Sequence, residues 1–191
     1  PVDCSVVESR VGKGSEYLVA SVLNSLSAPS GRAQSAINIE AGFESALALY
    51  QKHYRVVNGQ HAQVYPGVLE GLQALQKAGL KLACLTNKPL AFAQTLLRLK
   101  GLDGFFTVVF GGDSFARKKP DPLPLLKTCE ALDTVPDRTL MIGDSSNDAQ
   151  AARAAGCPVV LVTYGYNHGQ PVRGVDADGY VDSLADLCLL K

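Results

Sequence analysis

The sequence predicts an α/β protein with a doubly wound parallel sheet, joined to a small all-helical cap. From Tyr65 onward, short apolar runs alternate with segments whose apolar residues recur at helical spacing. The runs are almost continuously apolar, as the strands of a parallel sheet are when helices cover both of its faces. The first sixty residues show only the helical spacing. A chain of 191 residues is long enough for one such core with a small lid.

The strands and helices of the sheet domain are expected in regular alternation. The first helix ends at Gly101, a residue typical of helix C-termini, and the second carries its prolines only at its start, where helices tolerate them. The expected strands are 80–86, 106–112, 139–144 and 157–165, and the expected helices between them are 87–101, 121–133 and 147–156.

Two helices are expected before the sheet domain, at residues 15–26 and 40–57, with a turn containing glycine and proline between them. Neither segment has a convincing strand pattern. We therefore expect residues 1–61 to form part of a helical cap whose N-terminal part is missing, and residues 62–191 to form the core. The segment 58–67 joins the two.

Composition argues against several classes of function. The chain has 18 basic and 18 acidic residues, so no overall field favours nucleic acid or an anionic membrane. No apolar stretch approaches the length of a transmembrane helix. The five cysteines are dispersed and never form a Cys-x-x-Cys pair, which predicts reduced thiols in a cytoplasmic protein. The sequence leaves the oligomeric state open and allows a homodimer through an exposed helix face around Tyr50 and Tyr54.

The candidate chemistry lies where the apolar runs end, because ligands of open α/β sheets bind outside the carboxyl ends of the strands. The third run ends in Gly-Asp-Ser-Ser-Asn-Asp, which places Asp144 at the strand tip and Asp148 in the first turn of the next helix. Two carboxylates facing one crevice suit Mg²⁺, which takes oxygen ligands and usually only one or two protein carboxylates. The alternative is that one residue of 145–148 merely caps the helix. Capping accounts for one residue but not for the cluster, so we favour the metal interpretation.

Three further polar residues follow the other runs. Thr86 and Asn87 offer a hydroxyl and an amide suited to phosphate oxygens, although such residues often only cap the next helix. Lys119 follows two basic residues that we expect to be solvated. Pro120 biases the backbone of Lys119 toward extended geometry. The Lys119 ammonium is then expected to point into the crevice, where it offsets the carboxylates and a phosphate.

These segments, in this order, resemble the haloacid dehalogenase (HAD) superfamily. "LTNK", "KKPDP" and "IGDSSND" are similar to the second, third and fourth motifs of HAD phosphatases, and the resemblance covers nearly the whole chain. It implies a HAD-like Rossmannoid core and phosphomonoester hydrolysis through an aspartyl-phosphate, with Mg²⁺ as cofactor. It implies that Thr86 and Asn87 bind the phosphoryl group and that Lys119 stabilises its charge. Asp144 would ligate Mg²⁺, and Asp148 would either bind the metal through water or orient Lys119.

The segment "RVGKGSEYLV" (Arg10–Val19) resembles the cap of phosphoglycolate phosphatases, in which a glycine-containing loop leans over the substrate. This resemblance implies a small phosphorylated acid as substrate, with 2-phosphoglycolate the first expectation. Arg10 and Lys13 are candidates for contact with a substrate carboxylate, and solvation is the alternative for both. Two other functions stay open: a β-phosphoglucomutase-like or sugar-phosphate enzyme, and a non-catalytic binding protein that has lost its nucleophile.

One element of the family has no counterpart in the chain. HAD enzymes carry their nucleophile in a loop resembling D-x-D-G-T, and the near match here is "VDADGYVDS" (Val175–Ser183). Asp176 lacks the apolar strand that must precede a nucleophile, and Tyr180 stands where the threonine belongs. We therefore expect a surface turn followed by a terminal helix that Asp182 or Ser183 caps. We expect the first strand of the core and its nucleophile to lie upstream of residue 1, and the chain to be inactive alone.

Overall fold

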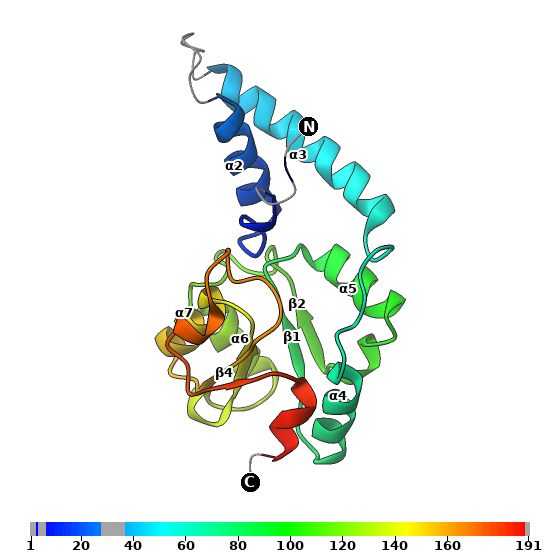
Figure 1. Ribbon diagram of the computed structural model, residues 1–191, viewed down its shortest axis with the longest axis vertical. Helices are drawn as coiled ribbons and strands as arrows, with labels where there is room; N and C mark the ends of the chain where they lie inside the picture. The colour runs from blue at the N-terminus through cyan, green and yellow to red at the C-terminus, as the bar shows by residue number, and fades with distance from the viewer. Residues whose placement is uncertain (1–2, 4–6, 28–36, 190–191) are drawn as a thin grey trace.

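A computed structural model describes residue 3, residues 7–27 and residues 37–189. It shows an α/β body and a helical hairpin that stands away from it (Figure 1). The helices are α2 (Ser15–Ser27), α3 (Ile37–Val57), α4 (Val68–Lys77), α5 (Leu90–Leu99), α6 (Leu123–Ala131) and α7 (Ser146–Ala155). The strands are β1 (Ala83–Leu85), β2 (Val108–Phe110), β3 (Met141–Gly143), β4 (Val159–Val162) and β5 (Gly179–Val181). The 3-10 helices are η1 (Asp103–Phe105), η2 (Pro136–Arg138), η3 (Val172–Gly174) and η4 (Leu184–Leu189).

The pairings between the described strands are all parallel. β1 pairs with β2, with Ala83 opposite Val108. β4 lies between β3 and β5 in a second sheet, with Met141 opposite Val159 and β5 paired with the last three residues of β4. This pairing, with helices following the strands, confirms the predicted α/β class. The described strands form two sheets, β1–β2 and β3–β4–β5.

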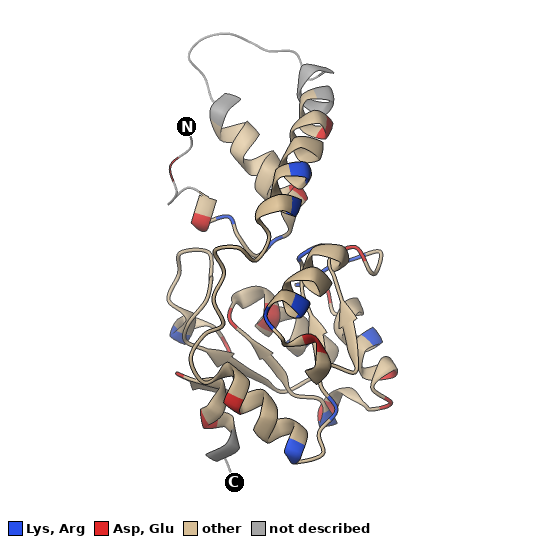
Figure 2. Cartoon of the chain, turned by 90° about the vertical axis from the view of Figure 1, so that its right-hand side faces the viewer, with Lys and Arg blue, Asp and Glu red and all other residues tan. Residues whose placement is uncertain are grey.

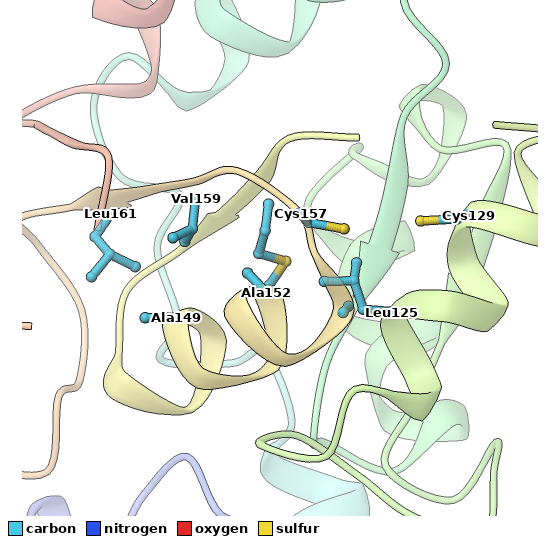
Figure 3. Close-up of a cluster of buried hydrophobic side chains, with 9 residues drawn as sticks. Leu125, Cys129, Ala149, Ala152, Cys157, Val159 and Leu161 are labelled. Carbon is cyan, nitrogen blue, oxygen red and sulfur yellow. The ribbon is translucent and has the colours of Figure 1, made fainter. Parts of the chain in front are cut away.

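Strand β4 shows why its sequence is apolar at every position. Successive side chains of a strand point to opposite faces of the sheet. Val159 and Leu161 pack with α6 and α7 on one face, where Figure 3 shows them beside Ala149 and Ala152. The alternate residues of β4 pack on the other face with α4, β5 and η4. Because helices cover both faces, the sheet has no solvent-facing side to favour polar residues.

The cysteines of this core are free thiols. Cys129 on α6 and Cys157 after α7 are both buried, and their sulfur atoms point toward each other (Figure 3). Burial, reinforced by the neighbouring Cys129, raises the pKa of Cys157 to about 12. Cys84 on β1 is also free. These free thiols are packing residues of the core, in agreement with the prediction of reduced cysteines.

Helices α2 and α3 lie side by side and extend away from the sheets, as two views at right angles show (Figures 1 and 2). The start of α2 faces the sheets, and the end of α3 returns to them. There Asn58 donates a hydrogen bond to the Phe92 carbonyl at 2.9 Å, and Tyr54 packs edge-on against the Phe92 ring. The division at residue 61 into cap and core stays a prediction.

Several elements differ from those predicted. Helix α4 and strand β5 were not predicted; β5 is only three residues long and follows a polar segment, so it lacks a strand signal of its own. The face around Tyr50 and Tyr54, expected to be exposed, is half-buried, because the two rings stack on each other and Tyr54 meets the core. Most of the turn expected between the two helices of the cap lies outside the described residues.

Candidate active site

The predicted site residues come from separate loops at the ends of β1 and β3 and before α6. Thr86 and Asn87 directly follow β1, Asp144 directly follows β3, and Asp148 lies in the first turn of α7. Lys119 lies in the loop before α6. Because β1 and β3 belong to different sheets, only the folded chain determines whether these side chains meet.

Lys119 and Asp148 form a buried ion pair. The Lys119 Nζ lies 2.7 Å from Asp148 Oδ1 and also donates to the Leu85 carbonyl of β1 at 2.7 Å. The two residues are only 9% and 4% exposed. Burial by itself raises the pKa of Asp148, but the Lys119 ammonium and hydrogen bonds from Lys119 and Ser145 hold this pKa below its usual range. The lowered pKa favours the ionised form of Asp148, and the pair links β1 to α7.

Asp148 also caps α7. Its Oδ2 accepts hydrogen bonds from the Ser145 hydroxyl at 2.7 Å and from the backbone N–H groups of Asp144 and Ser145, both at 3.1 Å. These bonds satisfy N–H groups at a helix start that lack partners within the helix. The sequence analysis treated helix capping and a role in the site as alternatives. In the structure Asp148 does both, because it caps α7 and also orients Lys119. Its direct or water-mediated binding of a metal stays a prediction.

Asp144 differs electrostatically from Asp148. Its Oδ2 accepts a hydrogen bond from the Tyr166 N–H at 3.0 Å, and no salt bridge joins it to a cation in the described part of the chain. Burial is the main cause that raises the pKa of Asp144 to about 6, and the nearby negative charge of Asp148 raises it further. A nearby positive charge would stabilise the ionised form of this carboxylate, so Asp144 is suited to bind a cation.

The donor set suits one type of metal ion better than others. In the described residues there is no group of three or more His, Cys, Asp and Glu side chains that could hold a metal. Zinc and calcium sites usually need such a cage, whereas Mg²⁺ is commonly held by one or two carboxylates with water and substrate phosphate. Asp144, with Asp148 behind it, fits the magnesium pattern.

Thr86 and Asn87 hold the local backbone in this structure. The Thr86 hydroxyl accepts a hydrogen bond from the Lys88 N–H at 3.1 Å. The buried Asn87 amide donates to the Lys119 carbonyl at 2.8 Å and to the Gly12 carbonyl at 3.0 Å. Asn87 therefore holds the backbone at Lys119. Binding of a phosphoryl group by Thr86 and Asn87 stays a prediction.

The structure adds contacts that the sequence analysis missed. Gly165 lies so close to Asp144 that a Cβ there would be 2.3 Å from Oδ2. Asn167, which is buried, accepts a hydrogen bond from the Ser146 N–H at 2.9 Å. The segment "YGYNHG" therefore wraps around the start of α7. Its glycines and asparagine are a turn signal, but only the fold shows which carboxylate the turn encloses.

The remaining candidates have other contacts. Arg10 donates to the Ser21 carbonyl at 2.8 Å, which ties its guanidinium to α2, and the Lys13 ammonium lies 5.1 Å from the centre of the Tyr17 ring. Asp176 has an 81% exposed side chain paired with Arg153 at 3.1 Å. This confirms that Asp176 is a surface residue.

The fold and these side chains define an α/β enzyme domain with a polar site at the carboxyl ends of parallel strands. The chain belongs to the haloacid dehalogenase-like hydrolase family, whose model matches residues 4–156. The predicted resemblance to this family is thereby confirmed. None of the described helices combines the length and the apolar content that crossing a bilayer requires.

Individual relatives are named phosphoglycolate phosphatases. The chain is 50% identical over 148 residues to such a protein from Thiobacillus denitrificans, covering 78% of this chain and 65% of the relative. It is 45% identical over 179 residues to one from Nitrosospira multiformis, covering 93% of this chain and 75% of the relative. A crystal structure described as a predicted phosphoglycolate phosphatase, from Haemophilus somnus, superposes with a TM-score of 0.87 at 31% identity, covering 99% of this chain and 82% of that one.

Proposed function

We propose that this chain belongs to a Mg²⁺-dependent phosphatase whose substrate is 2-phosphoglycolate. The observation that carries the proposal is the buried Lys119–Asp148 pair beside Asp144 at the ends of parallel strands. Phosphoryl transfer depends mainly on positioning the phosphoryl group and neutralising its charge. The Lys119 ammonium, which its ion pair fixes in place, meets the need for positive charge. Asp144 can bind a cation that adds to this charge. The names of the relatives support the choice of substrate.

Each residue has a role that its contacts allow. Lys119 would offset charge on the transferring phosphoryl group, and Asp148, with both oxygens already engaged, would keep the ammonium in place. Thr86 and Asn87 would hydrogen-bond the phosphate oxygens. Asp144 would hold Mg²⁺, which when bound supplies positive charge to the phosphate. An aspartyl-phosphate mechanism also needs a carboxylate nucleophile, a role that we assign to none of the carboxylates described above.

The test is a comparison of substrates on the full-length protein with Mg²⁺ present. We expect 2-phosphoglycolate to be hydrolysed with a higher kcat/KM than glucose 6-phosphate and other hexose phosphates. Lys119→Met and Asp144→Asn should each lower kcat while the protein stays folded. A preference for hexose phosphates would reject the substrate. Absence of turnover with every phosphomonoester, in a protein that still binds phosphate, would instead favour the non-catalytic alternative.

We also propose that the protein acts in the cytoplasm on a small-molecule substrate, without a nucleic-acid or membrane partner. Equal numbers of acidic and basic residues and the free, buried thiols support this proposal. In Figure 2 the positions of basic and acidic residues are interspersed along the chain.

A further inference from the structure

The loop between the chain start and α2 docks directly onto the candidate site. We call Val11–Gly14 the lid loop. The Gly12 carbonyl accepts a hydrogen bond from Asn87 Nδ2 at 3.0 Å and another from Asn147 Nδ2 at 3.3 Å. Both amide side chains are more than nine-tenths buried. The Gly12 carbonyl oxygen is therefore held by two buried core residues. Asn87 contacts Lys119, and Asn147 directly precedes Asp148 in the sequence.

A second contact holds the end of the same loop. Glu16, in the first turn of α2, pairs with Lys118 at 2.9 Å, and the two side chains are 49% and 36% exposed. Gly14 lies beneath this pair, and a Cβ there would be 2.9 Å from the Lys118 Nζ. Gly14 has a φ of +94°, so glycine is favoured by the backbone as well as by the space.

Both contacts are connected to the reactive lysine. Asn87, which holds the Gly12 carbonyl, also donates to the Lys119 carbonyl at 2.8 Å. Lys118, which pairs with Glu16, precedes Lys119 in the chain. The position of the lid loop and the position of the lysine are thus fixed by shared groups. If the lid loop opened, the hydrogen bond between Asn87 and Gly12 and the ion pair between Glu16 and Lys118 would be lost, and both lie next to Lys119.

We propose that Asn147 and the Glu16–Lys118 ion pair are positioning groups that form a latch, holding the lid loop closed against the Lys119 site. The latch rests on contacts across 135 residues for Asn147 and 102 residues for Lys118. Its effect on catalysis rests on the proposed function, because a closed lid excludes water from the phosphoryl group. The effect of the latch on the opening of the lid loop does not depend on the proposed function.

The sharpest test is proteolysis, because trypsin needs an extended segment around Lys13, whereas the closed lid loop turns at Gly12 and Gly14, both at positive φ. In the full-length protein, Asn147→Ala removes one hydrogen bond to Gly12. If opening is fast relative to cleavage, the loss of one such bond speeds cleavage after Lys13 by about 2- to 12-fold. Gln150→Ala is the matched control, because Gln150 is an exposed amide on the same helix. Cleavage after Lys77 in α4 should not change, which separates loop opening from global unfolding.

The ion pair is tested with Glu16→Gln, which keeps the shape and removes the charge. An exposed pair of this kind predicts an increase in cleavage after Lys13 of about 1.4- to 5-fold. The increase should disappear at high salt, which already screens the native pair. The control is Glu130→Gln, which breaks a comparably exposed pair with Lys127 far from the lid loop in the sequence. Adding Lys118→Gln to Glu16→Gln should have no further effect if the two charges act only on each other.

Kinetics give a readout that a merely structural role would not reproduce. If substrate binds only the closed lid, both latch variants should raise KM by less than they speed cleavage, because the closed form already dominates, and kcat should stay within about twofold of the wild-type value. Cleavage after Lys13 that is unchanged in both variants would overturn the latch, whatever the activity. Faster cleavage in a protein that does not hydrolyse 2-phosphoglycolate would leave the latch standing and reject the proposed substrate.

Discussion

The buried pair of Lys119 and Asp148 gives the most stringent prediction of stability. Lys119→Met removes the ammonium and leaves the Asp148 carboxylate with no cation within 4 Å among the described residues. Breaking a buried pair by removing one partner costs about 3–5 kcal/mol of unfolding free energy, because the remaining charge stays desolvated. We expect this loss in urea unfolding at pH 7, followed by circular dichroism.

The partner variants separate the ion pair from the helix cap. Asp148→Asn removes the charge and keeps one oxygen that can accept from Ser145. When it is combined with Lys119→Met, no unpaired charge is left, so the double variant should be more stable than Lys119→Met alone. The coupling free energy between the two changes should be about 1–3 kcal/mol. Additive losses, with no coupling, would refute the account of the pair as one electrostatic unit.

The same pair predicts the acid limb of the stability curve. The pKa of Asp148 is lower in the folded protein than in the unfolded chain, so its stabilisation is complete above the unfolded pKa, about 3.9. The stabilisation is lost as the pH falls below that value toward the folded pKa. Lys119→Met should flatten this part of the curve, measured as the urea midpoint between pH 5 and pH 2.

Three further predictions concern the surroundings of Asp144 and the surface. The pKa of Asp144 is about 6 in the folded protein, above its unfolded value, so acidification from pH 7 to pH 4 should relieve a destabilisation. Asp144→Asn should accordingly stabilise the metal-free protein at pH 7 by about 1–3 kcal/mol. It should also abolish the rise in thermal midpoint that Mg²⁺ gives the wild-type protein. A Mg²⁺ effect that persists in this variant would contradict the assignment of Asp144 as the metal ligand. Gly165→Ala should cost about 1–3 kcal/mol in thermal unfolding and weaken Mg²⁺ binding, because the Cβ would meet the Asp144 carboxylate. Gly169→Ala, also at positive φ but with nothing within 4 Å, controls for backbone strain alone; equal losses of Mg²⁺ affinity would reject the contact. Asp176→Asn should change stability by less than about 1 kcal/mol, since its pair with Arg153 is exposed, and should leave kcat unaltered.

Three of the candidate site residues were predictable because they directly follow an apolar run. Thr86, Asn87 and Asp144 directly follow β1 and β3, as the rule for open α/β sheets anticipates. Lys119 was identified from a proline that follows it, and in the structure its Nζ lies 2.7 Å from Asp148 Oδ1. These are local signals, carried by a few adjacent residues. Strand β5 was missed for the same reason, because its three residues carry no local pattern of their own.

Local patterns in the sequence were enough to predict the α/β class, the family and the candidate site residues, because apolar runs and short motifs involve only neighbouring residues. Which contacts each of these residues makes depends on the tertiary structure. Asp148 caps a helix and holds Lys119, which lies 29 residues away. Asn147 reaches Gly12 across 135 residues, and Tyr166 holds Asp144 across 22. Such contacts depend on the packing of separate helices, strands and loops against one another, and no spacing along the chain records them.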